Sequence, residues 1–89
     1  IERGHCYMAV SERDLASFIK QAKEYGFSIG EDVGLMSLDD TPLKEVLIGG
    51  VTTLTTDFSL MGEQAAKLIR NKEHLRIANP WRLHDRGSL

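Results

Sequence analysis

Two short groups of polar residues follow apolar segments of the sequence, and both could bind a polar small molecule. Ser11-Glu12 comes directly after the apolar run 6–10, and Asp39-Asp40 comes directly after the apolar run 33–38. A carboxylate can accept two hydroxyl hydrogens at once, and the start of a nearby helix helps to keep it ionised. The pattern indicates a hydrogen-bonding site, and the alternative is that Asp39-Asp40 only begins the turn and helix that follow it.

Chemistry that needs converging catalytic or metal-binding side chains has little support in the sequence. Cys6 is the single cysteine, so it can form no internal disulfide. The histidines lack the close spacing of helical metal sites and are His5, His74 and His84. A magnesium-dependent phosphoryl switch at Asp39 would need a lysine at the end of a later strand, where Thr55-Thr56 stands instead. We therefore expect no catalytic residue, no metal ligand and no cofactor.

The composition is typical of a small soluble domain with one core. The 89 residues are 42% hydrophobic and 27% charged, and 11 Lys+Arg against 13 Asp+Glu give a net charge of −2. A chain of this size buries about 60–65% of its unfolded surface. The acidic balance is the opposite of the basic surface that binds a phosphate backbone. We expect a cytoplasmic protein without a membrane partner, because the sequence has neither an apolar run of about 18 residues nor a basic leader.

A helix that opens at Ser11 would hold the first polar group at its N-terminus. Ser11 and Asp14 form the Ser-x-x-acid pattern of a capping box. Gly26 is placed for a left-handed cap at the other end. One apolar stripe at a 3.6-residue period is formed by Leu15, Phe18, Ile19 and Ala22.

Three apolar or β-branched runs predict strands, at 6–10, 33–38 and 51–56. The first of them would bury Cys6. A weaker strand is expected within 75–89, where Trp81 would anchor packing. Thr41 as N-cap and Pro42 at the first helical position predict a short helix that runs through Leu47.

A further amphipathic helix, capped by Asp57 or Ser59, completes the predicted order of elements. Its core face would be lined by Phe58, Met61, Ala65, Leu68 and Ile69. The alternation of strands and helices predicts an α/β fold with a partial doubly wound parallel sheet. In such sheets ligands bind beyond the carboxyl ends of the strands, where both polar groups are expected.

Five short motifs follow one another from residue 26 to residue 88. They are GFSIGEDV at 26–33, LDDTP at 38–42, VTTL at 51–54, DF with MGxxAA at 57–66, and LxxRxS at 83–88. Together they resemble the C-terminal part of the effector-sensing domain in lactose-repressor and galactose-repressor-type bacterial transcription regulators. That domain has the two-lobed fold of periplasmic sugar-binding proteins. The resemblance extends from about Met8 to the end of the chain.

The resemblance implies an effector site at Asp39, Ser11 and Glu12. Asp39 matches the first residue of the family's Asp-Asp pair directly. Ser11-Glu12 replaces an Asn-Asp pair that opens the first helix, which keeps hydrogen-bonding ability but changes its reach. Gly30 stands where the family usually has proline, a loop difference expected to matter little for function.

The resemblance also implies an architecture in which residues 1–89 form the C-terminal portion of a sensor domain. Segment 53–57 would cross the hinge between two lobes, and 57–72 would belong to the second lobe. Arg86 and Ser88 would be structural residues of the returning strand. The residues implied as dimer contacts, unless they are only the core of a short helix, are Leu43, Val46 and Leu47.

The function implied by the resemblance is effector sensing in a transcription regulator. The effector would be a sugar or a similar small polar molecule, and DNA would bind only through an N-terminal domain absent from this chain. We expect a homodimer and no enzymatic activity. The alternative is a periplasmic sugar-binding protein of a transporter, which a signal peptide in the full gene would distinguish.

Overall fold

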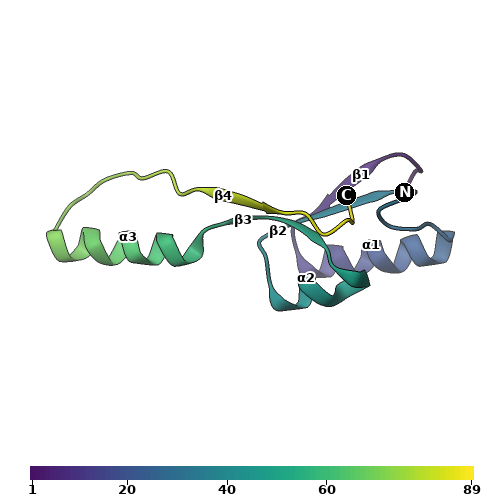
Figure 1. Ribbon diagram of the computed structural model, residues 1–89, viewed down its shortest axis with the longest axis horizontal. Coiled ribbons are helices and arrows are strands. Elements are labelled where there is room, and N and C mark those ends of the chain that lie inside the picture. The colour runs from purple at the N-terminus through teal and green to yellow at the C-terminus, as the bar shows by residue number, and fades with distance from the viewer.

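A four-stranded sheet in the order β1-β2-β3-β4 is the centre of the computed structural model, which describes residues 1–89 (Figure 1). The strands are β1 (Cys6–Ala9), β2 (Gly34–Leu38), β3 (Thr52–Thr56) and β4 (Trp81–His84). β1, β2 and β3 are parallel, and β4 is antiparallel to β3. The first three strands begin and end within one residue of the predicted runs.

Two helices cover one face of this sheet, and a third lies beyond its end (Figure 1). They are α1 (Glu12–Tyr25), α2 (Pro42–Val46), which continues into a 3₁₀ turn at Leu47–Gly49, and α3 (Phe58–Asn71). The molecule is therefore elongated, with extents of 55 × 21 × 19 Å. None of the helices has the length and apolar character that a membrane crossing requires.

The predicted caps and apolar stripe of α1 are confirmed. Ser11 Oγ accepts a hydrogen bond of 3.1 Å from the amide of Asp14, and Gly26 ends the helix at φ 71°. On the stripe, Leu15 and Ala22 are buried. The core beneath the helix is a cluster of Ala9, Leu15, Leu35 and Val51.

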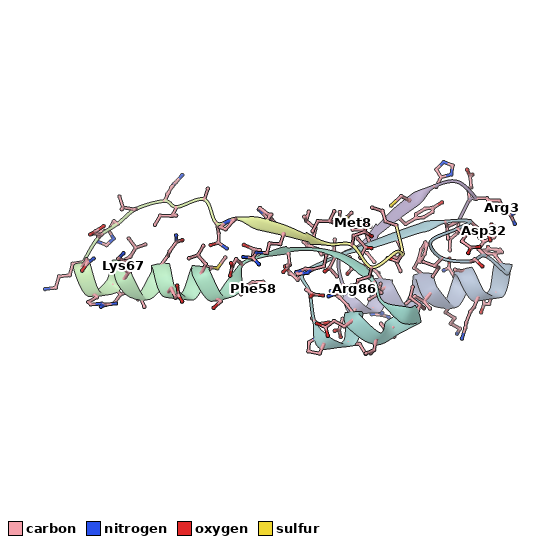
Figure 2. All side chains as sticks on the ribbon, viewed as in Figure 1. Arg3, Met8, Asp32, Phe58, Lys67 and Arg86 are labelled. Atoms are coloured by element: carbon pink, nitrogen blue, oxygen red, sulfur yellow. The ribbon has the colours of Figure 1, made fainter.

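The opposite face of the sheet is uncovered. The register places Met8 beside Met36, and both lie on the side away from the helices because side chains alternate along each strand. Figure 2 labels Met8 on β1, and this residue is 54% exposed. The predictions that Cys6 is buried and that Trp81 anchors packing are wrong, because both residues are exposed.

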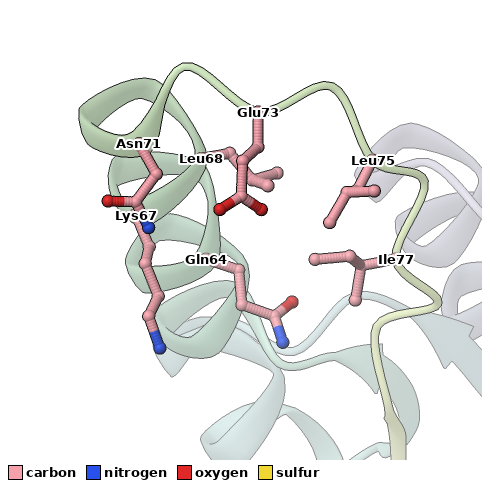
Figure 3. Close-up of a pocket in the computed structure, with 7 residues that line it drawn as sticks. All are labelled: Gln64, Lys67, Leu68, Asn71, Glu73, Leu75 and Ile77. Atoms are coloured by element: carbon pink, nitrogen blue, oxygen red, sulfur yellow. The ribbon is translucent and has the colours of Figure 1, made fainter.

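The apolar face of α3 also has no partner within this chain. Phe58, Met61 and Ile69 are exposed, and no residue of α3 is buried, so the prediction that they line a core is wrong here. The helix and the returning segment 73–77 stand apart and enclose a hollow of about 370 Å³ (Figure 3). The periodic apolar pattern predicts the helix correctly, but it cannot show whether another apolar surface packs against that helix. The assignment of 57–72 to a second lobe stays a prediction.

Two chain segments that join α3 to the sheet run side by side. Asp57 caps α3 by accepting from the amide of Leu60, and its own amide donates to the carbonyl of Pro80 at 3.1 Å. Asn79 Nδ2 donates to Thr56 Oγ1 at 2.6 Å and to the Asp57 carbonyl at 2.8 Å. These bonds hold the outgoing and returning segments together where they leave the sheet.

Candidate functional site

The two predicted polar groups lie at the same edge of the sheet. β1 and β2 are adjacent and parallel, with Ala9 opposite Ser37. Ser11 and Asp39 each follow that pair by two residues, so both stand beyond the carboxyl ends of neighbouring strands. This edge is where open α/β sheets bind ligands.

Asp39 and Asp40 have opposite environments although they are adjacent in the sequence. Asp39 is partly exposed, and its carboxylate has no hydrogen bond or ion pair within the protein. Asp40 accepts two hydrogen bonds of 2.8 Å from the guanidinium of Arg86, one to each oxygen. Of these two carboxylates, only that of Asp39 has no partner within the protein and is free to accept hydrogens from a ligand.

The charged side chain of Asp40 forms an ion pair that stabilises the fold. The pKa of Asp40 is lowered to about 2, mainly by the hydrogen bonds from Arg86, against the opposing effect of burial. The same contact raises the pKa of Arg86. Arg86 also donates to the Val51 carbonyl at 2.9 Å. The expectation that Arg86 is structural agrees with this geometry, which joins the chain end to the start of α2.

Ser88 is the second structural residue expected near the chain end, and it is buried. Its Oγ accepts from the amide of Thr52 at 2.7 Å and donates to the carbonyl of Leu35 at 2.6 Å. The side chain thereby links β3 to β2 where the two strands begin. Ser88 therefore supports the sheet at the end opposite to Asp39.

Ser11 and Glu12 are both exposed at the start of α1. Ser11 Oγ uses one acceptor position for the Asp14 amide, which leaves its hydroxyl hydrogen free to donate. Glu12 lines a groove between α1 and α2, on the helix-covered side of the sheet. Neither Asp39 nor Ser11 lines any of the four cavities of the chain.

Lys44 is a residue of this edge that sequence reasoning missed. Its side chain is buried, and Nζ donates to the carbonyl of Leu38 at 2.8 Å and to the carbonyl of Asp39 at 2.6 Å. A lysine in a short helix ordinarily predicts a solvent-exposed side chain. No signal in the sequence shows that α2 turns this one toward the end of β2.

The predicted dimer contacts lie on α2 and the turn after it. Leu43 is 47% exposed and Val46 is 71% exposed, whereas Leu47 is half-buried against the core. The groove between α1 and α2 has a volume of about 390 Å³, and its apolar lining includes Leu43 and Leu47.

A mostly parallel four-stranded sheet, with helices on one face and free polar groups at its carboxyl edge, defines an α/β domain. Residues 5–89 match the family described as periplasmic binding protein-like domain. The chain belongs to this family, and the resemblance inferred from the five motifs is confirmed at that level. No curated protein matches the sequence significantly.

Solved structures of transcription regulators have the same fold. A candidate transcription regulator from Staphylococcus saprophyticus subsp. saprophyticus is 24% identical with a TM-score of 0.74, over 94% of this chain and 32% of its own. The dimeric Lac repressor with an 11-residue C-terminal deletion is 19% identical with a TM-score of 0.75, over 93% and 32%. The lactose repressor bound to the anti-inducer ONPF is 19% identical with a TM-score of 0.74, over 93% and 33%. The chain therefore spans about a third of these relatives.

Proposed function

We propose that this chain is part of the effector-sensing domain of a cytoplasmic transcription regulator. It binds a small polar effector of the sugar class and has no catalytic role. The observation that carries the proposal is the unpaired Asp39 carboxylate at the carboxyl edge of the sheet. The neighbouring Asp40 carboxylate is paired with Arg86. The similar solved structures are those of transcription regulators, which supports this reading over that of a transporter receptor.

Asp39 is the principal effector contact in this proposal, and Ser11 and Glu12 are the secondary ones. An ionised carboxylate without an internal partner can accept two hydroxyl hydrogens, which suits a vicinal diol of a sugar. The free hydroxyl hydrogen of Ser11 adds a donor at the same edge. The rest of the binding cleft comes from parts of the protein outside this chain.

Ligand binding in the full-length protein tests the assignment of Asp39. D-glucose, D-galactose, D-ribose and L-arabinose are added separately, and thermal unfolding is followed. A ligand present at about one hundred times its Kd stabilises the folded state by about 2.7 kcal/mol. We expect at least one sugar to raise the Tm, the rise to be much smaller in Asp39→Asn, and the full rise to persist in the exposed control Glu24→Gln. A panel without any shift, or a full shift in Asp39→Asn, contradicts the proposal.

Coupling to DNA separates the regulator from the transporter receptor. Double-stranded DNA of random sequence is selected for binding by the full-length protein, and the sugar that raises the Tm is then added. A regulator enriches a sequence and changes its affinity for that sequence when the sugar binds. A transporter receptor binds the sugar and enriches no sequence.

The proposed protein is a homodimer that pairs through α1 and α2. The exposed side chains of Leu43 and Val46, the apolar groove beside them and the half-buried Leu47 support this surface. We expect Val46→Glu to shift the full-length protein toward monomer in analytical ultracentrifugation. Gln21→Glu, which adds the same charge at an exposed position of α1, is the control and should leave the dimer intact.

A further inference from the structure

Lys44 is the exception among the five lysines of the chain. Its residue is 2% exposed, whereas the other four lysines are exposed. An ammonium group is costly to remove from water unless polar atoms of the protein replace its hydration. The position of Lys44 therefore depends on the atoms that its Nζ contacts.

Those atoms are two successive backbone carbonyls at the end of β2. Nζ donates to the carbonyl of Leu38 at 2.8 Å and to that of Asp39 at 2.6 Å. Successive carbonyls of an extended strand point to opposite sides, so one ammonium cannot normally bind both. Asp39 has φ 64°, and this left-handed conformation turns the two carbonyls to the same side.

The left-handed conformation is unfavourable for a residue with a side chain, although Asp tolerates it better than most. A charged donor shared by the two carbonyls stabilises it, because charge-assisted hydrogen bonds are the strong ones. Lys44 is itself fixed, since its amide donates to the Thr41 carbonyl at 3.0 Å and its carbonyl accepts from Val51 at 2.7 Å. The backbone conformation at Asp39 in turn determines the direction in which its carboxylate leaves the chain.

We propose that Lys44 is a positioning residue of the effector site. Its ammonium holds Asp39 in the left-handed conformation and thereby aims the Asp39 carboxylate at the hydroxyl groups of the effector. The inference rests on the proposed function, because it assigns Lys44 a role in binding through Asp39. It adds a residue that does not touch the effector to the determinants of affinity.

The test on binding is a double-mutant cycle in the full-length protein, measured by calorimetry with D-glucose, D-galactose, D-ribose and L-arabinose. Lys44→Met is expected to raise the Kd of the sugar about tenfold, which is the size typical of losing a supporting contact. The double variant Lys44→Met with Asp39→Asn is expected to bind no more weakly than Asp39→Asn alone. The control Lys67→Met removes an exposed lysine of α3 and should leave the Kd unchanged. Additive losses, or a lower Tm with an unchanged Kd, overturn the positioning role.

A crystal structure of the variant without sugar gives a second readout that is independent of the effector. In Lys44→Met, Asp39 is expected to leave the positive-φ region, and a retained φ near 64° overturns the inference. If Lys44→Met does not fold, Lys44→Gln replaces it in the test. Its amide group keeps a hydrogen-bond donor, so the same changes are expected at a smaller size. If the unmodified protein binds none of the four sugars, the proposed function fails, and the backbone of Asp39 in the variants still decides the role of Lys44.

Discussion

Replacing Asp40 by asparagine tests the ion pair that joins the start of α2 to the end of the chain. Both carboxylate oxygens accept from Arg86 at 2.8 Å, and the two side chains are only 19% and 18% exposed. Asparagine keeps the shape of the side chain but loses its charge. Its NH2 group is a donor that cannot bond to the guanidinium, which has only donors itself. The substitution therefore removes the interaction with little change in packing.

The pKa of Asp40 gives the size of the effect and its dependence on pH. A fall from 3.8 to about 2 corresponds to about 2 kcal/mol of stability. Because the pKa is lower in the folded state, this stability is fully present above the unfolded value of 3.8 and is lost as the pH falls toward 2. Asp40→Asn should therefore cost about 2 kcal/mol at neutral pH, and the cost should shrink in acid.

Urea unfolding of the full-length protein, followed by far-UV circular dichroism, measures this difference. The unmodified protein and Asp40→Asn are compared near neutral pH and again at about pH 3. The exposed control Glu24→Gln should cost almost nothing at either pH. The ion pair does not stabilise the fold as argued if Asp40→Asn lowers the free energy of unfolding by less than about 0.5 kcal/mol at neutral pH. The same holds if the loss is equally large in acid.

Three further substitutions test particular contacts by thermal unfolding. Gly30→Ala should destabilise by about 1–3 kcal/mol, because Gly30 has φ 96° and a Cβ there would collide with the Gly87 carbonyl; an unchanged Tm contradicts that approach. Ser11→Ala should cost about 1 kcal/mol by removing the cap on Asp14, and Ser11→Asp should retain most of it; equal losses would show that capping is unimportant. Ser88→Ala should cost about 2 kcal/mol, because its buried Oγ makes two hydrogen bonds; a loss below that of Ser11→Ala would be against this reasoning.

The local elements could be predicted from the sequence because their signals are themselves local. Ser11 as N-cap and Gly26 as left-handed cap fix α1 from neighbours within a few residues. The three parallel strands follow from apolar or β-branched runs, and β4 lies within 75–89, where a weaker strand is expected. The Thr41 side chain is an exception, because it makes no capping hydrogen bond and Pro42 alone starts α2.

Burial could not be predicted in the same way, because it depends on what lies against each face. Phe58 and Met61 have the spacing of a core stripe, yet they are exposed since no part of this chain packs on that side of α3. Cys6 lies in a strand as expected but on the uncovered face of the sheet. Period and composition determine which residues share a face, and only the surrounding structure determines whether that face is covered.

The division of roles between Asp39 and Asp40 shows why the site itself needed the structure. By local pattern alone the two carboxylates are equivalent, and it is the resemblance to the regulator family that singles out Asp39 as the ligand contact. The left-handed turn at Asp39 separates them and directs Asp40 to Arg86, which lies 46 residues further along the chain. Lys44, five residues after Asp39, contacts the backbone at that same turn. Contacts at such different separations leave no periodic pattern, so neither periodicity nor composition could explain why Asp39 is the carboxylate that stays unpaired.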